Sequence, residues 1–239
     1  MESPELRPRN LRKTCMTSIV VAEDTRRAAS TRVTWFCLCF SLFSMLIIRQ
    51  AFRAVTHEPG TALVFAREAC MFASAGMLAW IVRRKVKLTP RAIGIGASPL
   101  WKSLLWGLVI AVACILPAAS IAKFTGYGHG ADSQAFAKLP IWLVFVVVVR
   151  AGVVEEFFYR GNAINLLQKL GAGRTAAWSI PLVIFSAAHW TGGWPNILMS
   201  LVLGAVLTAF YQWRRDLVSN MFGHFLVDFV ANVLPVMFA

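Results

Sequence analysis

The stretch PIWLVFVVVVRAGVVEEFFYR, residues 140–160, joins an apolar run to two adjacent carboxylates, Glu155 and Glu156. An apolar run of this kind is typical of a helix that enters a lipid bilayer. A charged side chain at the bilayer centre costs about 2.5–3.5 kcal/mol on insertion scales, so two in succession need a partner, a water-filled cavity or a function. The stretch therefore predicts a membrane helix, and it is the first place to look for a functional site.

The composition of the whole chain agrees with that prediction. Of its 239 residues, 58% are hydrophobic and 15% are charged, whereas soluble domains are usually about 45–50% apolar. A net charge of +13 would suggest nucleic acid as the partner of a soluble domain. Here the basic residues flank apolar segments, which favours a role in membrane topology and predicts no nucleic-acid partner.

Seven segments are long and apolar enough to cross a bilayer, for which about 20 residues are needed. The predicted fold is therefore an all-α, polytopic transmembrane helix bundle of about seven membrane helices. We divide the chain into a basic, disordered cytoplasmic tail (1–33), a three-helix membrane scaffold (34–138) and a four-helix membrane core (139–239) that carries the candidate functional residues. The expected spans are residues 34–55, 61–82, 101–122, 139–168, 174–194, 196–213 and 217–238.

The positions of Lys and Arg predict the orientation. With the N-terminus in the cytoplasm, the basic tail and the loops after the second, fourth and sixth spans share one side and carry most of the 24 Lys and Arg residues. This is the bias of the positive-inside rule. We therefore expect a multi-pass protein, located in a bacterial inner (plasma) membrane, with its N-terminus cytoplasmic and its C-terminus outside.

Helical spacing sorts the polar residues of the last four spans by face. Glu156 and Arg160 are four residues apart, which predicts an ion pair on one side of the helix. Glu155 is turned about 100° away and is left free for other work. His224 and Asp228 are also four apart, so both side chains can face one cavity.

The levels of these residues can be compared along the chain. Glu155 and His189 are equally distant in sequence from Ala172, which lies in the turn between the fourth and fifth spans. In an antiparallel helical hairpin this puts the two side chains at the same height. His224 is closer to its own cytoplasmic turn, so it joins them only if the hairpin projects deeper into the cytoplasm.

A carboxylate and two histidines in one membrane cavity suit hydrolysis. A glutamate can draw a proton from water and return it to a leaving amine, and a histidine can stabilise the oxyanion. Alternatively, Glu155, His189 and His224 can ligate a single divalent metal such as zinc that activates the water. The His-Glu-x-x-His spacing of many zinc proteases is absent. The residues therefore leave open whether any cofactor is required.

Three motifs on successive spans carry a resemblance to a known family. EEFFYR (155–160) fits E-E-x-x-x-R, FSAAH (185–189) fits F-x-x-x-H, and HFLVD (224–228) fits H-x-x-x-N/D. In this order they resemble the CAAX prenyl endopeptidase and bacteriocin-processing (CPBP) family of intramembrane proteases, which includes the type II CAAX protease. The resemblance covers about residues 139–232.

The resemblance also implies a role for each motif residue. Glu155 is expected to be the water-activating base and His189 its partner on the water, while His224 and Asp228 form the oxyanion-stabilising pair. Glu156 and Arg160 would shape the site. Asp228 stands where similar prenyl endopeptidases usually carry Asn, which puts its oxyanion role in question, because an Asp can instead orient His224 or attract a cation.

The function expected from these residues is that of an intramembrane endopeptidase. Its partners would be the lipid bilayer and a membrane-associated protein or peptide substrate, prenylated or not. One alternative is a secondary transporter or proton relay, for which inverted repeats are expected but not visible. Another is a non-catalytic membrane scaffold or an immunity-type protein, in which the charged residues form only a buried cluster.

Overall fold

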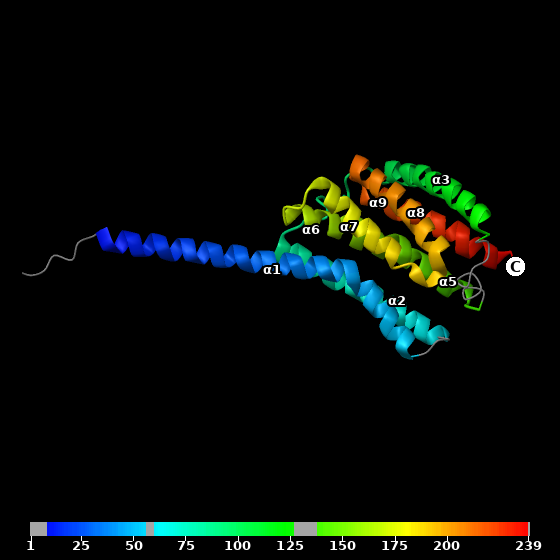
Figure 1. The fold of residues 1–239 in the computed structure, drawn as a ribbon, viewed down its shortest axis with the longest axis horizontal. Helices are drawn as coiled ribbons and strands as arrows, with labels where there is room; N and C mark the ends of the chain where they lie inside the picture. Colours follow the sequence, from blue (N-terminus) through cyan, green and yellow to red (C-terminus); the bar gives the residue numbers. More distant parts are fainter. Residues whose placement is uncertain (1–8, 56–59, 127–137, 239) are drawn as a thin grey trace, which may run out of the picture.

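A computed structural model describes residues 9–55, 60–126 and 138–238, with side chains from residue 30 onward. In these ranges the chain forms helices and no strand. Figure 1 shows the helices running alongside one another in a bundle, from which the first half of α1 (Arg9–Val55) projects. The prediction of an all-α transmembrane bundle is confirmed.

Five helical segments of the described chain are long and apolar enough to cross a membrane. They agree with the predicted first, second, third, sixth and seventh spans, and the protein is a multi-pass membrane protein. These segments are Ser30–Val55, Thr61–Val86, Leu100–Thr125, Trp190–Arg214 and Leu217–Met237. They contain the C-terminal part of α1, α2 (Thr61–Ile81) with η1 (Val82–Val86), α3 (Leu100–Thr125), η4 (Trp190–Gly192) with α8 (Gly193–Arg214), and α9 (Leu217–Asp228) with η5 (Phe229–Val233) and α10 (Leu234–Met237).

The predicted fourth and fifth spans form the helical hairpin that carries the glutamates. The fourth is a helix without interruption, made of α5 (Ile141–Arg150), η2 (Ala151–Glu155), η3 (Phe157–Ala163) and α6 (Ile164–Lys169). We call it the glutamate helix. The fifth is α7 (Arg174–Ala187), which ends earlier than the predicted residue 194. The chain turns there because Thr191 and two glycines follow His189 and Trp190.

The predicted tail, residues 1–33, overlaps the first helix of the structure. Helix α1 begins at Arg9, so it runs through most of the segment 1–33, while residues 1–8 lie outside the described residues. The division into tail, scaffold and catalytic core stays a prediction.

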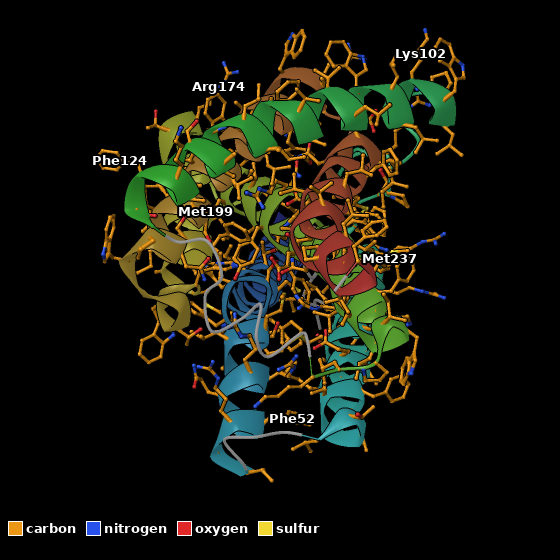
Figure 2. The ribbon with its side chains drawn as sticks, turned by 90° about the vertical axis from the view of Figure 1, so that its right-hand side faces the viewer. Phe52, Lys102, Phe124, Arg174, Met199 and Met237 are labelled. Carbon is orange, nitrogen blue, oxygen red and sulfur yellow. The ribbon has the colours of Figure 1, made fainter. Side chains whose placement is uncertain are left out.

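The glutamate helix lies in the middle of the bundle. Helices α1 and α2 pack on one side of it, and α9 packs on the other with α3 and α8 behind (Figure 2). The main hydrophobic core joins α1 and α2 to this helix and includes Leu38, Met71 and Phe158, each at most 2% exposed. The charged residues of the helix are therefore placed between two layers of other helices.

The glutamate helix contains two π-helical stretches, η2 and η3. A π-helix bonds residue i to i+5 and leaves some carbonyls without their usual partner, and such turns are frequent at functional sites. Side chains supply the missing donors: Ser41 Oγ of α1 donates to the Phe158 carbonyl at 2.6 Å, and Asn162 Nδ2 donates to the Phe157 carbonyl at 2.9 Å.

A glycine lets α9 approach the π-helical stretch. A Cβ atom added at Gly152 would lie 2.8 Å from the carbonyl oxygen of Met221 and 2.9 Å from Phe225. Small residues of this kind allow membrane helices to pack closely. The close approach brings the polar residues of α9 next to those of the glutamate helix.

Candidate active site

Glu155 is held by an arginine of its own helix. The guanidinium of Arg150 donates from Nη1 to Glu155 Oε1 and from Nε to Glu68 Oε2, the latter at 2.7 Å. Both carboxylates are buried, with Glu155 8% and Glu68 0% exposed. Arg67 closes the cluster with a 2.8 Å bond to the other oxygen of Glu68.

The expectation that Glu155 is free of partners is therefore wrong for one of its oxygens. That expectation assumed 3.6 residues per turn, whereas η2 begins directly after Arg150. The i, i+5 register of a π-helix brings Arg150 over Glu155. Among the described residues, Oε2 of Glu155 has no hydrogen-bond partner, so this oxygen remains available to a water molecule.

Glu156 differs from Glu155 because both of its carboxylate oxygens accept hydrogen bonds from protein side chains. Its Oε1 accepts from Arg160 Nη1 at 2.7 Å and from His224 Nδ1 at 2.9 Å, and its Oε2 accepts from Asn220 Nδ2 at 3.2 Å. The carboxylate is 0% exposed. The predicted pair of Glu156 with Arg160 is present.

His224 is joined to the glutamate helix rather than to Glu155. Its Nδ1 meets Glu156, so Nε2 is left on the side of Asp228, whose nearest carboxylate oxygen is 3.8 Å away. That distance is too long for a hydrogen bond. His224 and Asp228 do face the same way from α9, as their spacing predicts, but of the two only His224 forms a hydrogen bond to the glutamate helix.

His189 lies just beyond the end of α7 and is bound through one ring nitrogen. Its Nδ1 is 2.8 Å from the carbonyl oxygen of Phe185. Since a carbonyl only accepts hydrogen bonds, Nδ1 carries the proton in this arrangement. Nε2 of a neutral ring is then an acceptor that can bind a water molecule.

Glu155 and His189 line one small cavity, as their equal height along the hairpin predicts. The cavity has a volume of about 10 Å³, close to the smallest that holds one water molecule. The lining comes from α1, the glutamate helix, α7 and the turn that follows α7. The lining residues are Met45, Leu46, Arg49, Glu155, Tyr159, Phe185, Ala188 and His189.

Phe185 lies close to both histidines. Its ring centroid is 4.8 Å from that of His189 and 6.3 Å from that of His224. The Arg160 guanidinium lies 4.6 Å from the same ring on the side of Glu156. Of the three residues expected at one pocket, Glu155 and His189 line the cavity, and His224 is bonded to Glu156 and does not line it.

The arrangement does not fit a metal ion bound by Glu155, His189 and His224. One oxygen of Glu155 is occupied by Arg150, and Nδ1 of His224 is occupied by Glu156. Across the described ranges, no three His, Cys, Asp or Glu side chains are grouped so that they could hold a metal. We therefore derive no step through a metal.

Two residues of the site lie in α1 and α2, which carry none of the three motifs. Glu68 of α2 binds Arg150, and Arg49 of α1 lines the cavity. Both are charged residues within apolar segments, which by itself marks a candidate functional residue in a membrane protein. The sequence shows that signal but not the helix against which each residue packs.

Comparisons with known proteins add a family to this geometry. Residues 137–230 match the family model described as type II CAAX prenyl endopeptidase Rce1-like. No curated protein and no solved structure gives a significant match. The matched range contains all three motifs, and it confirms the resemblance that they indicate. The segment 137–230 of this chain is therefore similar to the type II CAAX prenyl endopeptidase Rce1-like family.

Proposed function

We propose that the protein is an intramembrane endopeptidase of the CAAX type, in which a water molecule held between Glu155 and His189 attacks a peptide bond. The observation that carries this proposal is the shared cavity. It is large enough for about one water molecule, and its lining includes Glu155, which has a carboxylate oxygen without a partner among the described residues, and His189, which has a free imidazole nitrogen. The family of residues 137–230 supports the same class of reaction.

The reaction follows from the proton inventory of these two residues. The water oxygen forms a bond to the carbonyl carbon of the substrate while one water proton passes to Glu155 Oε2. His189 Nε2 accepts a hydrogen bond from the same water and fixes its orientation. The proton on Glu155 then passes to the amide nitrogen, the C–N bond breaks, and the products are a carboxylic acid and an amine.

The remaining motif residues support the site in this proposal. Arg150 fixes the rotamer of Glu155 by holding Oε1, so that Oε2 faces the cavity. Glu156, Arg160 and His224 tie the glutamate helix to α9 at a second point. The position of Asp228, 3.8 Å from His224 Nε2, suits orientation of the imidazole better than donation to an oxyanion, because an ionised carboxylate only accepts hydrogen bonds.

The substrate in this proposal is a membrane-associated protein or peptide, lipidated or not. The basic residues Arg83, Arg84 and Lys85 in η1 lie at the end of the second membrane segment. By the positive-inside rule they favour a cytoplasmic location for that end and for the N-terminus.

The test compares the wild type with Glu155→Gln and His189→Ala in proteoliposomes. Candidate substrates come from membrane proteins that are shortened in cells with the wild type but not in cells with Glu155→Gln. Gln keeps the hydrogen bond from Arg150 but cannot take the proton, so we expect cleavage to fall by about 10²–10⁴-fold. The elution profile in detergent should stay that of the wild type.

The same vesicles separate this function from its alternatives. Processing of a genuine substrate by either variant at the wild-type rate would overturn the proposal. A proton or ion flux that depends on Glu155, without proteolysis, would identify the transporter instead. Neither activity, together with retained partner binding, would identify a scaffold.

A further inference from the structure

Arg49 is the arginine in the lining of the cavity that Glu155 and His189 share. It belongs to α1, outside the range matched by the family model, yet it lines the cavity together with Glu155 and His189. Its side chain reaches the chain segment that carries His189: Nη1 donates to the Ala188 carbonyl and Nη2 to Thr191 Oγ1, both at 3.4 Å. Typical N–H···O bonds are about 2.9–3.0 Å long. Arg49 thus has five N–H donors and only two long contacts.

The other two arginines close to the motif residues are paired with carboxylates. Arg150 binds Glu68 and Glu155, and Arg160 binds Glu156 at 2.7 Å. For Arg49, in contrast, no carboxylate of the described residues lies within the 4.0 Å limit of an ion pair. An arginine at membrane depth without a carboxylate partner is costly unless it serves a function.

The proposed reaction has a need that the other motif residues leave unmet. Attack of water puts negative charge on the carbonyl oxygen, and preorganised donors close to that oxygen are usually the largest single contribution to such catalysis. Nδ1 of His224 is engaged by Glu156. Asp228 offers a carboxylate, which does not donate when ionised. Neither residue lines the cavity.

We propose that Arg49 is the oxyanion-stabilising residue of the protein. Its guanidinium would bind the carbonyl oxygen of the scissile bond, exchanging the long contacts to Ala188 and Thr191 for shorter bonds as the charge develops. The proposal rests on the proposed endopeptidase function and extends it, because it assigns a catalytic role to the first membrane helix. The site is then completed by the scaffold rather than contained in residues 137–230.

A structural role for Arg49 makes a different prediction. An arginine that only ties α1 to the end of α7 would affect the stability of the fold and act on substrate and transition state alike. An oxyanion donor acts chiefly in the transition state, so its removal lowers kcat while KM changes little. The decisive measurement must therefore separate kcat from KM.

The experiment uses the full chain in proteoliposomes with Arg49→Gln and Arg49→Lys, and Arg53→Gln as the matched control. Arg53 is one turn further along α1 and is exposed. We expect kcat to fall about 10²–10³-fold in Arg49→Gln, with KM within about threefold of the wild type. Lys keeps the charge but not the paired donors, so its kcat should lie between the two. The control should behave as the wild type.

A second readout uses a substrate peptide in which a phosphinate replaces the scissile amide and mimics the tetrahedral, anionic state. Its affinity for Arg49→Gln should fall in proportion to kcat, while the unmodified peptide binds Arg49→Gln, Glu155→Gln and their double variant with similar affinity. Measured per folded molecule, this comparison also holds if the variant is less stable.

The outcomes separate the two proposals. An unchanged phosphinate affinity, or a loss that appears only as a lowered melting temperature, would overturn the role of Arg49. If Glu155→Gln abolishes cleavage but Arg49→Gln has the kcat of the wild type, only the assignment of Arg49 fails. If Glu155→Gln cleaves as well as the wild type, the endopeptidase itself is wrong.

Discussion

The two sides of the glutamate helix each carry a buried glutamate and an arginine, but the two glutamates differ in how completely their oxygens are hydrogen-bonded. On the side of α8 and α9, Glu156 has partners for both oxygens in Arg160, His224 and Asn220. On the side of α1 and α2, Glu155 has one oxygen on Arg150, and its side chain lines a cavity that Arg49 also lines. We call these the closed cluster and the open cluster. The two adjacent glutamates thus differ in their surroundings because different helices pack against them.

The difference follows from the energetics of buried charge. Taking an ion pair out of water costs about as much as the pairing returns, so such a pair adds little net stability, but removing one partner leaves an uncompensated charge. A substrate could bind a charged group of the closed cluster only by displacing that group's partner, which would leave a buried charge uncompensated. The open cluster keeps a carboxylate oxygen and a guanidinium that a substrate and water can bind.

The largest expected effect is the loss of one partner in the closed cluster. Arg160 is 1% exposed, and Arg160→Met should destabilise the fold by about 3–5 kcal/mol because it leaves Glu156 buried without its cation. Thermal unfolding in detergent, followed by intrinsic fluorescence, measures this loss. Cleavage per folded molecule should change far less than stability.

A double variant supplies the control for that prediction. Glu156→Gln removes the charge but keeps an amide that can bond to His224 and Asn220. Glu156→Gln/Arg160→Met should therefore be more stable than Arg160→Met alone. If the double variant is less stable by the sum of the two single effects, the closed cluster is not held by a coupled pair.

The sequence predicts the closed cluster better than the open one, for a geometric reason. Glu156 and Arg160 are four residues apart, and their pairing is present in the structure. The partner of Glu155 could not be foreseen, because the i, i+5 contact with Arg150 depends on the π-helical turn η2. Gly152 gives the only hint of that turn, since it is needed where α9 approaches the helix.

Contacts between distant helices are the second limit of sequence reasoning. The apolar runs predict the membrane segments because a bilayer fixes their length, and equal distance from a turn predicts that Glu155 and His189 share a level. Periodicity does not indicate that Glu68 meets Arg150 or that the Phe185 ring contacts both His189 and His224. Such facts depend on how the helices rotate against one another.

An intermediate effect is expected where the scaffold meets the open cluster. Arg150 bridges Glu68 and Glu155, so Glu68→Gln and Arg150→Lys should each disturb the same geometry and lower kcat by about tenfold. Their effects should not add, and a double-mutant cycle on kcat/KM should show a coupling of about 0.5–3 kcal/mol. Additive losses would show that Glu68 acts independently of Arg150.

The smallest expected effect is that of removing metal ions. In the open cluster the available metal ligands are one carboxylate oxygen and one imidazole nitrogen, and His224, which could supply a third, binds Glu156 through Nδ1 and does not line the cavity. Dialysis against a strong chelator should therefore leave cleavage within about twofold of the untreated enzyme, since a metal site with a catalytic role normally has three protein ligands. Activity that is lost on chelation and restored by Zn²⁺ would mean that His224 leaves Glu156 and that the Arg150 bridge opens to admit the ion. The separation of the two clusters would then not hold in the working enzyme.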